Sequence, residues 1–132
     1  MPVYVVAIDA PSDQDRIDLA KIYADAPDWL LAAHASAEAL VEAGLASGTL
    51  IAGRFNDRLL GAALLQREEK EWRLSHLCVR KITRGRGVAR RIIEESRRQA
   101  DDADARLHLA APLDNLEIQA LAARTHLPLR PL

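Results

Sequence analysis

The segment Arg84-Gly85-Arg86-Gly87-Val88-Ala89 constrains the fold more than any other part of the chain. It follows an apolar run at residues 74–79, typical of a strand, and it opens a helical pattern at residues 88–100. Glycines in such a loop let backbone N–H groups turn outward, and a helix N-terminus adds partial positive charge. The surrounding residues are basic, with no acidic residue from 80 to 91: Arg80, Lys81, Arg84, Arg86, Arg90 and Arg91. The segment predicts a site for a polyanion.

Motif spacing narrows the choice of ligand. A dinucleotide fingerprint requires a third glycine where Arg90 stands, and a P-loop requires a Gly-Lys-Ser/Thr ending that is absent. What remains is Arg-x-x-Gly-x-Ala from Arg84 to Ala89. This resembles the (Gln/Arg)-x-x-Gly-x-(Gly/Ala) motif of the GNAT acetyltransferase superfamily, which grips the pyrophosphate of coenzyme A. An ordinary surface turn with a solvated basic face is the alternative.

The resemblance implies a cofactor site for acetyl-CoA or coenzyme A. In GNAT proteins the strand before the loop splays away from its neighbour, and its backbone bonds to the pantetheine amides; here that role falls to Leu77 and Val79. Asn115 matches a polar position that faces the pantetheine, although it also suits an ordinary helix cap. The expected cofactor residues are Leu77, Cys78, Val79, Thr83, Arg84, Gly85, Arg86, Gly87, Val88, Ala89, Arg90 and Asn115.

Length and composition fit one domain over residues 1–132 that buries its own core. The sequence contains 18 Lys and Arg and 19 Asp and Glu, so general attraction to nucleic acid or to anionic membranes is not expected. One cysteine excludes an internal disulfide framework, and no metal site is predicted. No membrane span or leader pattern occurs, so we expect a cytoplasmic protein that is monomeric alone.

The elements follow a mixed order. Strands are expected at residues 2–8, 49–55, 58–66, 71–79 and 106–110, with a hairpin turn at Asn56-Asp57. Helices are expected from Ser12 to about residue 26 with an apolar side at Ile17, Ala20 and Tyr23/Ala24, and then at 28–47, 88–100 and 115–124. This order is that of a GNAT α/β (α+β) fold, with a mixed, mostly antiparallel sheet flanked by helices. Because residues 125–132 contain two prolines, the C-terminal end should be truncated.

The catalytic apparatus expected of an acetyltransferase is sparse. Amine acetylation needs a general base and usually an acid for the thiolate. The only tyrosines, Tyr4 and Tyr23, lie far from the last helix. His76 is a weak candidate base, and a structural role is the alternative. Cys78 has no evident histidine partner and fits a core position.

A narrower resemblance rests on segments that occur in the same order. Residues 12–19 with Lys21-Ile22, residues 51–60, and residues 77–89 are similar to the PanZ (PanM) family of GNAT-fold factors. That family promotes self-cleavage of the aspartate 1-decarboxylase proenzyme in pantothenate and coenzyme A biosynthesis. The resemblance implies coenzyme A-dependent binding of the proenzyme, with Arg54 and Asn56 facing it; Asn56 also suits the turn itself.

The chain departs from that family's pattern at residues 28–48 and after Asp114, so other functions stay open. The first expectation is a coenzyme A-dependent regulator of decarboxylase maturation. The second is an N-acetyltransferase that acts on an unknown amine. The third is a binder of another polyanion, which the scarcity of aromatic residues disfavours for single-stranded nucleic acid.

Overall fold

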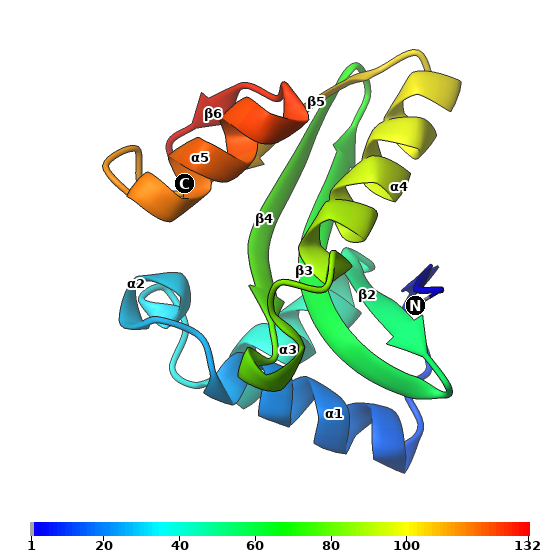
Figure 1. Ribbon diagram of the computed structural model, residues 1–132. Helices are drawn as coiled ribbons and strands as arrows, with labels where there is room; N and C mark the ends of the chain where they lie inside the picture. The colour runs from blue at the N-terminus through cyan, green and yellow to red at the C-terminus, as the bar shows by residue number, and fades with distance from the viewer. Residues whose placement is uncertain (1) are drawn as a thin grey trace.

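A single six-stranded sheet organises the computed structural model, which describes residues 2–132 (Figure 1). The strand order in space is the order in sequence, from β1 to β6. Strands β1 to β4 pair antiparallel, whereas β4–β5 and β5–β6 pair parallel. The strands are β1 (Tyr4–Ala7), β2 (Leu50–Phe55), β3 (Arg58–Glu68), β4 (Glu71–Val79), β5 (Arg106–Ala110) and β6 (Leu129–Arg130).

The predicted strands are therefore confirmed, and β6 is an addition. It lies between Pro128 and Pro131, which cannot donate to a ladder, so it is only two residues long. The turn between β2 and β3 is also as predicted. Asn56 and Asp57 have φ values of 46° and 64°, a conformation these residues tolerate in tight hairpins.

Helices cover both faces of the sheet and create two separate cores. Helices α1 (Asp13–Ala24), α2 (Asp28–Leu31) and α3 (Ala37–Ser47) bury one set of apolar side chains against the sheet, which includes Leu19, Leu40 and Leu59. Helix α4 (Val88–Asp102) buries Val88, Ile92 and Ile93 in the other core, where α5 (Leu116–Thr125) contributes Ala122.

Helix α1 begins where it was predicted but buries a different side. Ser12 and Asp15 form a reciprocal capping box. Ile17, however, is 49% exposed, and Ala20 and Ala24 also face solvent. Of the predicted residues only Tyr23 is buried, and it shares the buried side with Leu19, Ile22, Asp15 and Asp18. The apolar residues alone did not predict the buried side, because this side also contains the carboxylates of Asp15 and Asp18. Each carboxylate is paired with an arginine of the β2–β3 hairpin.

The predicted helix over residues 28–47 is divided into α2 and α3. The break lies at residues 32–36, and Ser36 caps α3 by accepting a hydrogen bond from the amide of Ala39. A serine at a helix N-cap satisfies an amide that otherwise lacks an acceptor, and this local preference outweighs the high helix propensity of the neighbouring alanines. Gly48 ends α3 in the left-handed conformation.

Strand β4 contains an irregularity that opens the sheet. The pairing between β3 and β4 shifts register between Ala62 and Leu64, where His76 has a φ of 54°. Pairing of β4 with β5 runs only from Glu71 to Ser75. Beyond Ser75 the two strands part, so the end of β4 is unpaired on the side facing β5.

Candidate functional site

A cleft of about 560 Å³ lies where β4 and β5 separate. Its floor is the end of β4, and its walls come from the α1–α2 connection, α2 and α5. In Figure 1, α2 and α5 lie on the same side of β4. The loop between β4 and α4 closes one end. The lining residues are Asp25, Ala26, Pro27, Trp29, Leu30, Leu77, Cys78, Val79, Lys81, Thr83, Arg84, Gly85, Val88, Ala89, Glu117, Ile118, Leu121 and Arg124.

The loop at that end presents free backbone donors. Within residues 2–132, no protein acceptor bonds the amide groups of residues 85–90, and the first α4 amide with such a bond is that of Arg91, to the carbonyl of Gly87. Gly85 and Gly87 have φ values of 79° and 83°, which are accessible to glycine at little cost. A row of unbonded amides at the start of a 15-residue helix favours an anion there.

The basic residues around this loop differ in what they bind. Arg90 pairs with Glu94 at 2.9 Å, and Arg91 lies 3.8 Å from Glu95, so both arginines already face a carboxylate. The guanidinium of Arg84 donates to the carbonyl oxygens of Val79 and Asp25, each at 3.1 Å. Arg84 thereby holds the loop against both β4 and the end of α1.

Most of the predicted cofactor residues gather at the cleft. Leu77, Cys78, Val79, Thr83, Arg84, Gly85, Val88 and Ala89 line it. Gly87 and Arg90 line an adjoining cavity of about 190 Å³ together with Ala89, Leu121, Arg124 and Thr125. Arg86 is exposed beside them and lines neither cavity.

Asn115 does not line the cleft. Its side chain caps α5, because Oδ1 accepts a hydrogen bond of 3.0 Å from the amide of Ile118. The arrangement supports the helix-cap reading of this residue.

Sequence reasoning missed the walls of the cleft. Trp29 and Leu30 come from α2, while Ile118, Leu121 and Arg124 come from α5. Residues 117–124 contain an i, i+3 apolar pair, Ile118 and Leu121, that was a readable signal for a helix face. Nothing local indicates that Trp29 faces the cleft, since the other lining residues of β4 and α5 are far from it in the sequence.

A small recess continues the cleft along β4. It shares Trp29, Leu77, Ile118 and Leu121 with the main cleft and is otherwise formed by Leu74, Ser75, His76, Leu109, Ala110 and Ala111. Its volume is about 10 Å³, which corresponds to about one water molecule.

His76 is the titratable residue of this recess. Its Nδ1 lies 2.8 Å from Ser75 Oγ, and its ring meets His34 edge to face with centroids 5.4 Å apart. Nε2 is shielded from solvent and has no hydrogen-bond partner within residues 2–132. Burial, reinforced by His34 and Arg73, lowers the pKa of His76 to about 4, so the imidazole is neutral near pH 7.

Tyr23 and Cys78 serve the structure beneath the cleft. The hydroxyl of Tyr23 donates to the carbonyl oxygen of His76 at 2.9 Å, and burial raises the pKa of this phenol far above its usual range. Cys78 Sγ donates to the carbonyl of Ile22, and burial raises the pKa of the thiol to about 11. Both groups stay protonated near pH 7.

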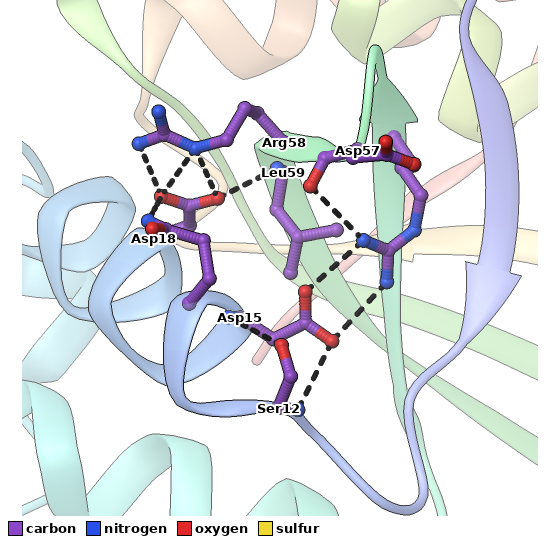
Figure 2. A network of polar contacts seen from close by, with 8 residues as sticks. Ser12, Asp15, Asp18, Asp57, Arg58 and Leu59 are labelled. Atoms are coloured by element: carbon purple, nitrogen blue, oxygen red, sulfur yellow. Dashed lines mark hydrogen bonds and ion pairs between the residues drawn. The ribbon is translucent and has the colours of Figure 1, made fainter.

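The hairpin predicted to face a partner is fixed to α1 by two ion pairs (Figure 2). Arg54 donates to both carboxylate oxygens of Asp15, at 3.0 and 3.2 Å. Arg58 pairs with the fully buried Asp18 at 2.7 Å, and Asp18 also accepts from the amide of Leu59. Burial on its own raises the pKa of Asp18, but the bonds from Arg58, Leu59 and Gln14 outweigh it and lower that pKa to about 2.

These contacts give Arg54 a structural role in place of the predicted partner contact. Its guanidinium is engaged with Asp15 and with the carbonyl of Asp57, so it positions the hairpin tip. Asn56 stands exposed at that tip. No helix within residues 2–132 is long and apolar enough to cross a bilayer. No cluster of three or more His, Cys, Asp or Glu side chains suited to a metal ion occurs over the same residues.

Comparison with solved structures assigns the fold. The chain superposes on a PaiA N-acetyltransferase from Thermoplasma acidophilum in complex with coenzyme A, with a TM-score of 0.70 over 94% of this chain and 88% of that one, at 12% identity. It also matches a GNAT family acetyltransferase from Elizabethkingia anophelis with acetyl-CoA bound, at a TM-score of 0.65, 17% identity, and 92% and 73% coverage. The fold is that of a GNAT acetyltransferase domain, as the sequence predicted.

The family follows from the sequence comparisons. The chain belongs to the PanZ family, whose model, described as an acetyltransferase (GNAT) domain, matches residues 2–127. It is 34% identical over 95 residues to the PanD regulatory factor of Escherichia coli (strain K12), an alignment that covers 72% of this chain. That alignment spans 66% of the length of the relative.

Proposed function

We propose that the protein binds coenzyme A or acetyl-CoA and, in that state, promotes self-cleavage of the aspartate 1-decarboxylase proenzyme. Cofactor binding is supported by the row of amides at residues 85–90, which have no acceptor within residues 2–132, beside an open cleft of about 560 Å³. Amide groups at a helix N-terminus suit a pyrophosphate, and the cleft between β4 and β5 suits an extended chain with amides of its own.

The residues present fit that ligand. The loop offers amides to the phosphate groups, together with the side chains of Arg80, Lys81 and Arg86, which make no ion pair within residues 2–132. Leu77 and Val79 offer backbone groups to the pantetheine arm, although the Val79 carbonyl already accepts from Arg84. Coenzyme A, when bound, supplies a thiol that forms thioesters. The residues of the loop and of β4 hold the cofactor in place.

The partner half of the proposal rests on the family and on the hairpin. The E. coli relative is named PanD regulatory factor. The family model matches residues 2–127, which include the β2–β3 hairpin. Asp15 and Asp18 fix that hairpin, so Asn56 is presented on a rigid tip. A preformed tip loses little conformational entropy on binding, which favours a protein contact.

The deciding experiment is a cleavage assay with the decarboxylase proenzyme of the same organism. Purified proenzyme is incubated alone, with this protein, and with this protein plus coenzyme A or acetyl-CoA, and the two cleavage fragments are followed on a gel. We expect faster cleavage only when protein and cofactor are both present. Cleavage that is unchanged by the protein, while the cofactor binds it, would contradict the regulatory role.

Acetylation of an amine is the second candidate, and one observation favours it. His76, which lines the recess beyond the cleft, is a neutral imidazole whose Nε2 has no hydrogen-bond partner within residues 2–132. Neither tyrosine is placed to protonate the thiolate, since Tyr23 is fully buried with its hydroxyl bonded to the His76 carbonyl and Tyr4 lies on β1. Release of free thiol from acetyl-CoA in the presence of an amine panel would support this candidate over the first.

A further inference from the structure

We propose that one face of strands β4, β5 and β6 binds an acidic segment of another protein, with a carboxylate of that segment held between Arg73 and Arg130 beside His108. This inference goes beyond the proposed function and does not depend on the coenzyme A site. Arg73 on β4 is the register partner of His108 on β5, and Arg130 on β6 is the partner of Ala110, two residues further along β5. Because side chains alternate between the two faces of a sheet, these three side chains form one row on the same face.

The apolar cover of that face ends at β4. On the opposite face, Trp72 and Leu107 are buried in the core beneath α4 and α5, and Leu129 packs against it. The core beneath α1, α2 and α3 includes residues of β2, β3 and β4 but, among residues 2–132, none of β5 or β6. A sheet face that no helix covers is solvated or meets another molecule, so this part of the sheet is available to a partner.

His108 is a buried polar group in the row that lacks a hydrogen-bond partner. The residue is 8% exposed, and its Nδ1 is shielded from solvent and has no partner within residues 2–132. Such a nitrogen costs free energy until a ligand completes its bonding. Burial and, after it, Arg130 and Arg73 lower the pKa of His108, so the ring is neutral near pH 7. In the tautomer with the proton on Nδ1, this nitrogen donates to a carboxylate oxygen.

The two arginines have donors left for a ligand. Arg73 makes no ion pair and no side-chain hydrogen bond within residues 2–132. Arg130 lies 3.8 Å from Glu71, and both of these side chains are about half exposed, so their pair is weak. A guanidinium group has five N–H donors and binds a carboxylate through two parallel hydrogen bonds. A ligand carboxylate therefore bonds to both arginines without breaking a buried pair.

The shape of the site favours a protein segment over a small acid. None of the three residues lines the cleft, the adjoining cavity or the recess described above, whereas small ligands bind mainly in concave sites. Arg106, exposed on the same face of β5 two residues before His108, adds a further positive charge. Several cations spread over an open face complement several carboxylates on a partner surface better than they complement one free acid.

The test follows the His108 imidazole by ¹⁵N NMR at pH 7 while the wild-type protein is titrated with a hexaglutamate peptide. We expect a saturable shift of the Nδ1 signal with this peptide, none with hexaglutamine, and weaker binding at higher salt. Arg73→Gln and Arg130→Gln should each weaken the binding about three- to tenfold, between the effects of an exposed and a buried ion pair.

Lys21→Gln is the matched control. Lys21 is exposed on α1 and makes no ion pair within residues 2–132, so the variant removes the same charge from a different part of the surface. Its affinity for hexaglutamate should match that of the wild type within about twofold. Equal weakening in the arginine variants and in Lys21→Gln would reflect net charge alone and would overturn the site.

The remaining outcomes are equally decisive. A His108 signal that stays unchanged at saturating peptide overturns the proposal. So does a shift confined to the amides of Gly85 and Gly87, because the peptide would then occupy the cofactor loop. Succinate that binds as tightly as hexaglutamate overturns the assignment to a protein segment, since one small acid would then satisfy the row.

Discussion

The hydroxyl of Tyr23 lies 2.9 Å from the carbonyl oxygen of His76, a contact that joins the buried side of α1 to the bulge of β4. It connects residues 53 positions apart in the sequence. The bulge is the point at which β4 leaves β5, so the shape of the cleft depends on a side chain that is itself absent from the cleft wall.

Tyr23→Phe tests this support. The change removes the hydroxyl and leaves the carbonyl of His76 without that donor, so we expect the free energy of unfolding to fall by about 1 kcal/mol. Urea denaturation measures this directly. Affinity for acetyl-CoA should fall as well, because the bulge is no longer held in one position. An unchanged affinity would mean that β4 keeps its shape without the bond.

Gly87→Ala and its control Gly48→Ala test whether the loop at residues 85–90, here called the anion loop, binds phosphate. Both glycines have positive φ, and an added Cβ at either position meets no protein atom within 4 Å. Each variant should therefore lose about 1 kcal/mol of stability from backbone strain. Only Gly87→Ala should weaken coenzyme A binding, by about tenfold or more, since only that Cβ lies where phosphate must approach the amides. Titration calorimetry with both variants decides, and equal affinities would place the phosphates elsewhere.

Asp18→Asn should remove an acid-sensitive part of the stability. The pKa of Asp18 is about 2 in the folded protein, below the ordinary value of 3.8, so its ionised form stabilises the fold above pH 4. That contribution is lost as the pH falls from about 4 towards 2. At pH 7 the variant should be less stable by about 2 kcal/mol, a hydrogen-bonded charge being worth that much.

The control for that variant is Glu42→Gln, which breaks the exposed pair with Arg16. Because both side chains are about half exposed, little stability should be lost. The wild type and Asp18→Asn should converge near pH 2 in thermal unfolding. A constant difference at every pH would show that Asp18 acts through packing and not through its charge.

Asn56→Gly isolates the proposed partner contact from the turn. Glycine adopts the φ of 46° found at this position, so the hairpin should keep its stability. Removal of the amide should weaken capture of the decarboxylase proenzyme by about fivefold or more, which corresponds to one or two lost hydrogen bonds. Asp57→Gly, at a φ of 64° next to it, is the control and should bind normally. Equal loss in both variants would indicate a turn effect only.

Cys78 should resist alkylation in the folded protein. Burial raises the pKa of this thiol to about 11, so almost none of it is thiolate at pH 8. Iodoacetamide should modify it at pH 8 only on the timescale of unfolding, and addition of urea should accelerate the reaction. Rapid modification of the native protein, detected by mass spectrometry, would show that the thiol contacts solvent and is reactive.

Several local features were readable from single segments. The strand–loop–helix unit around Gly85 and Gly87, the Ser12 cap, the Asn56-Asp57 turn and the Gly48 stop each depend on neighbouring residues, and each is present. Two expectations failed for a common reason. The buried side of α1 was inferred from its apolar residues. The unbroken helix over residues 28–47 was inferred from its helix-forming residues. Pairing with distant arginines and capping by Ser36 decided instead.

The sequence by itself determined the fold class and the anion loop, because backbone conformation at glycines, caps and turns is a local property. Only the tertiary structure decided what surrounds that loop. It brought Trp29 and Ile118 into the lining of one cleft, engaged Arg84 and Arg54 within the protein, and set His76 beside a recess about one water molecule in size. The physical reason is that these contacts join segments far apart in the chain, and their energies depend on burial and distance that no local pattern specifies.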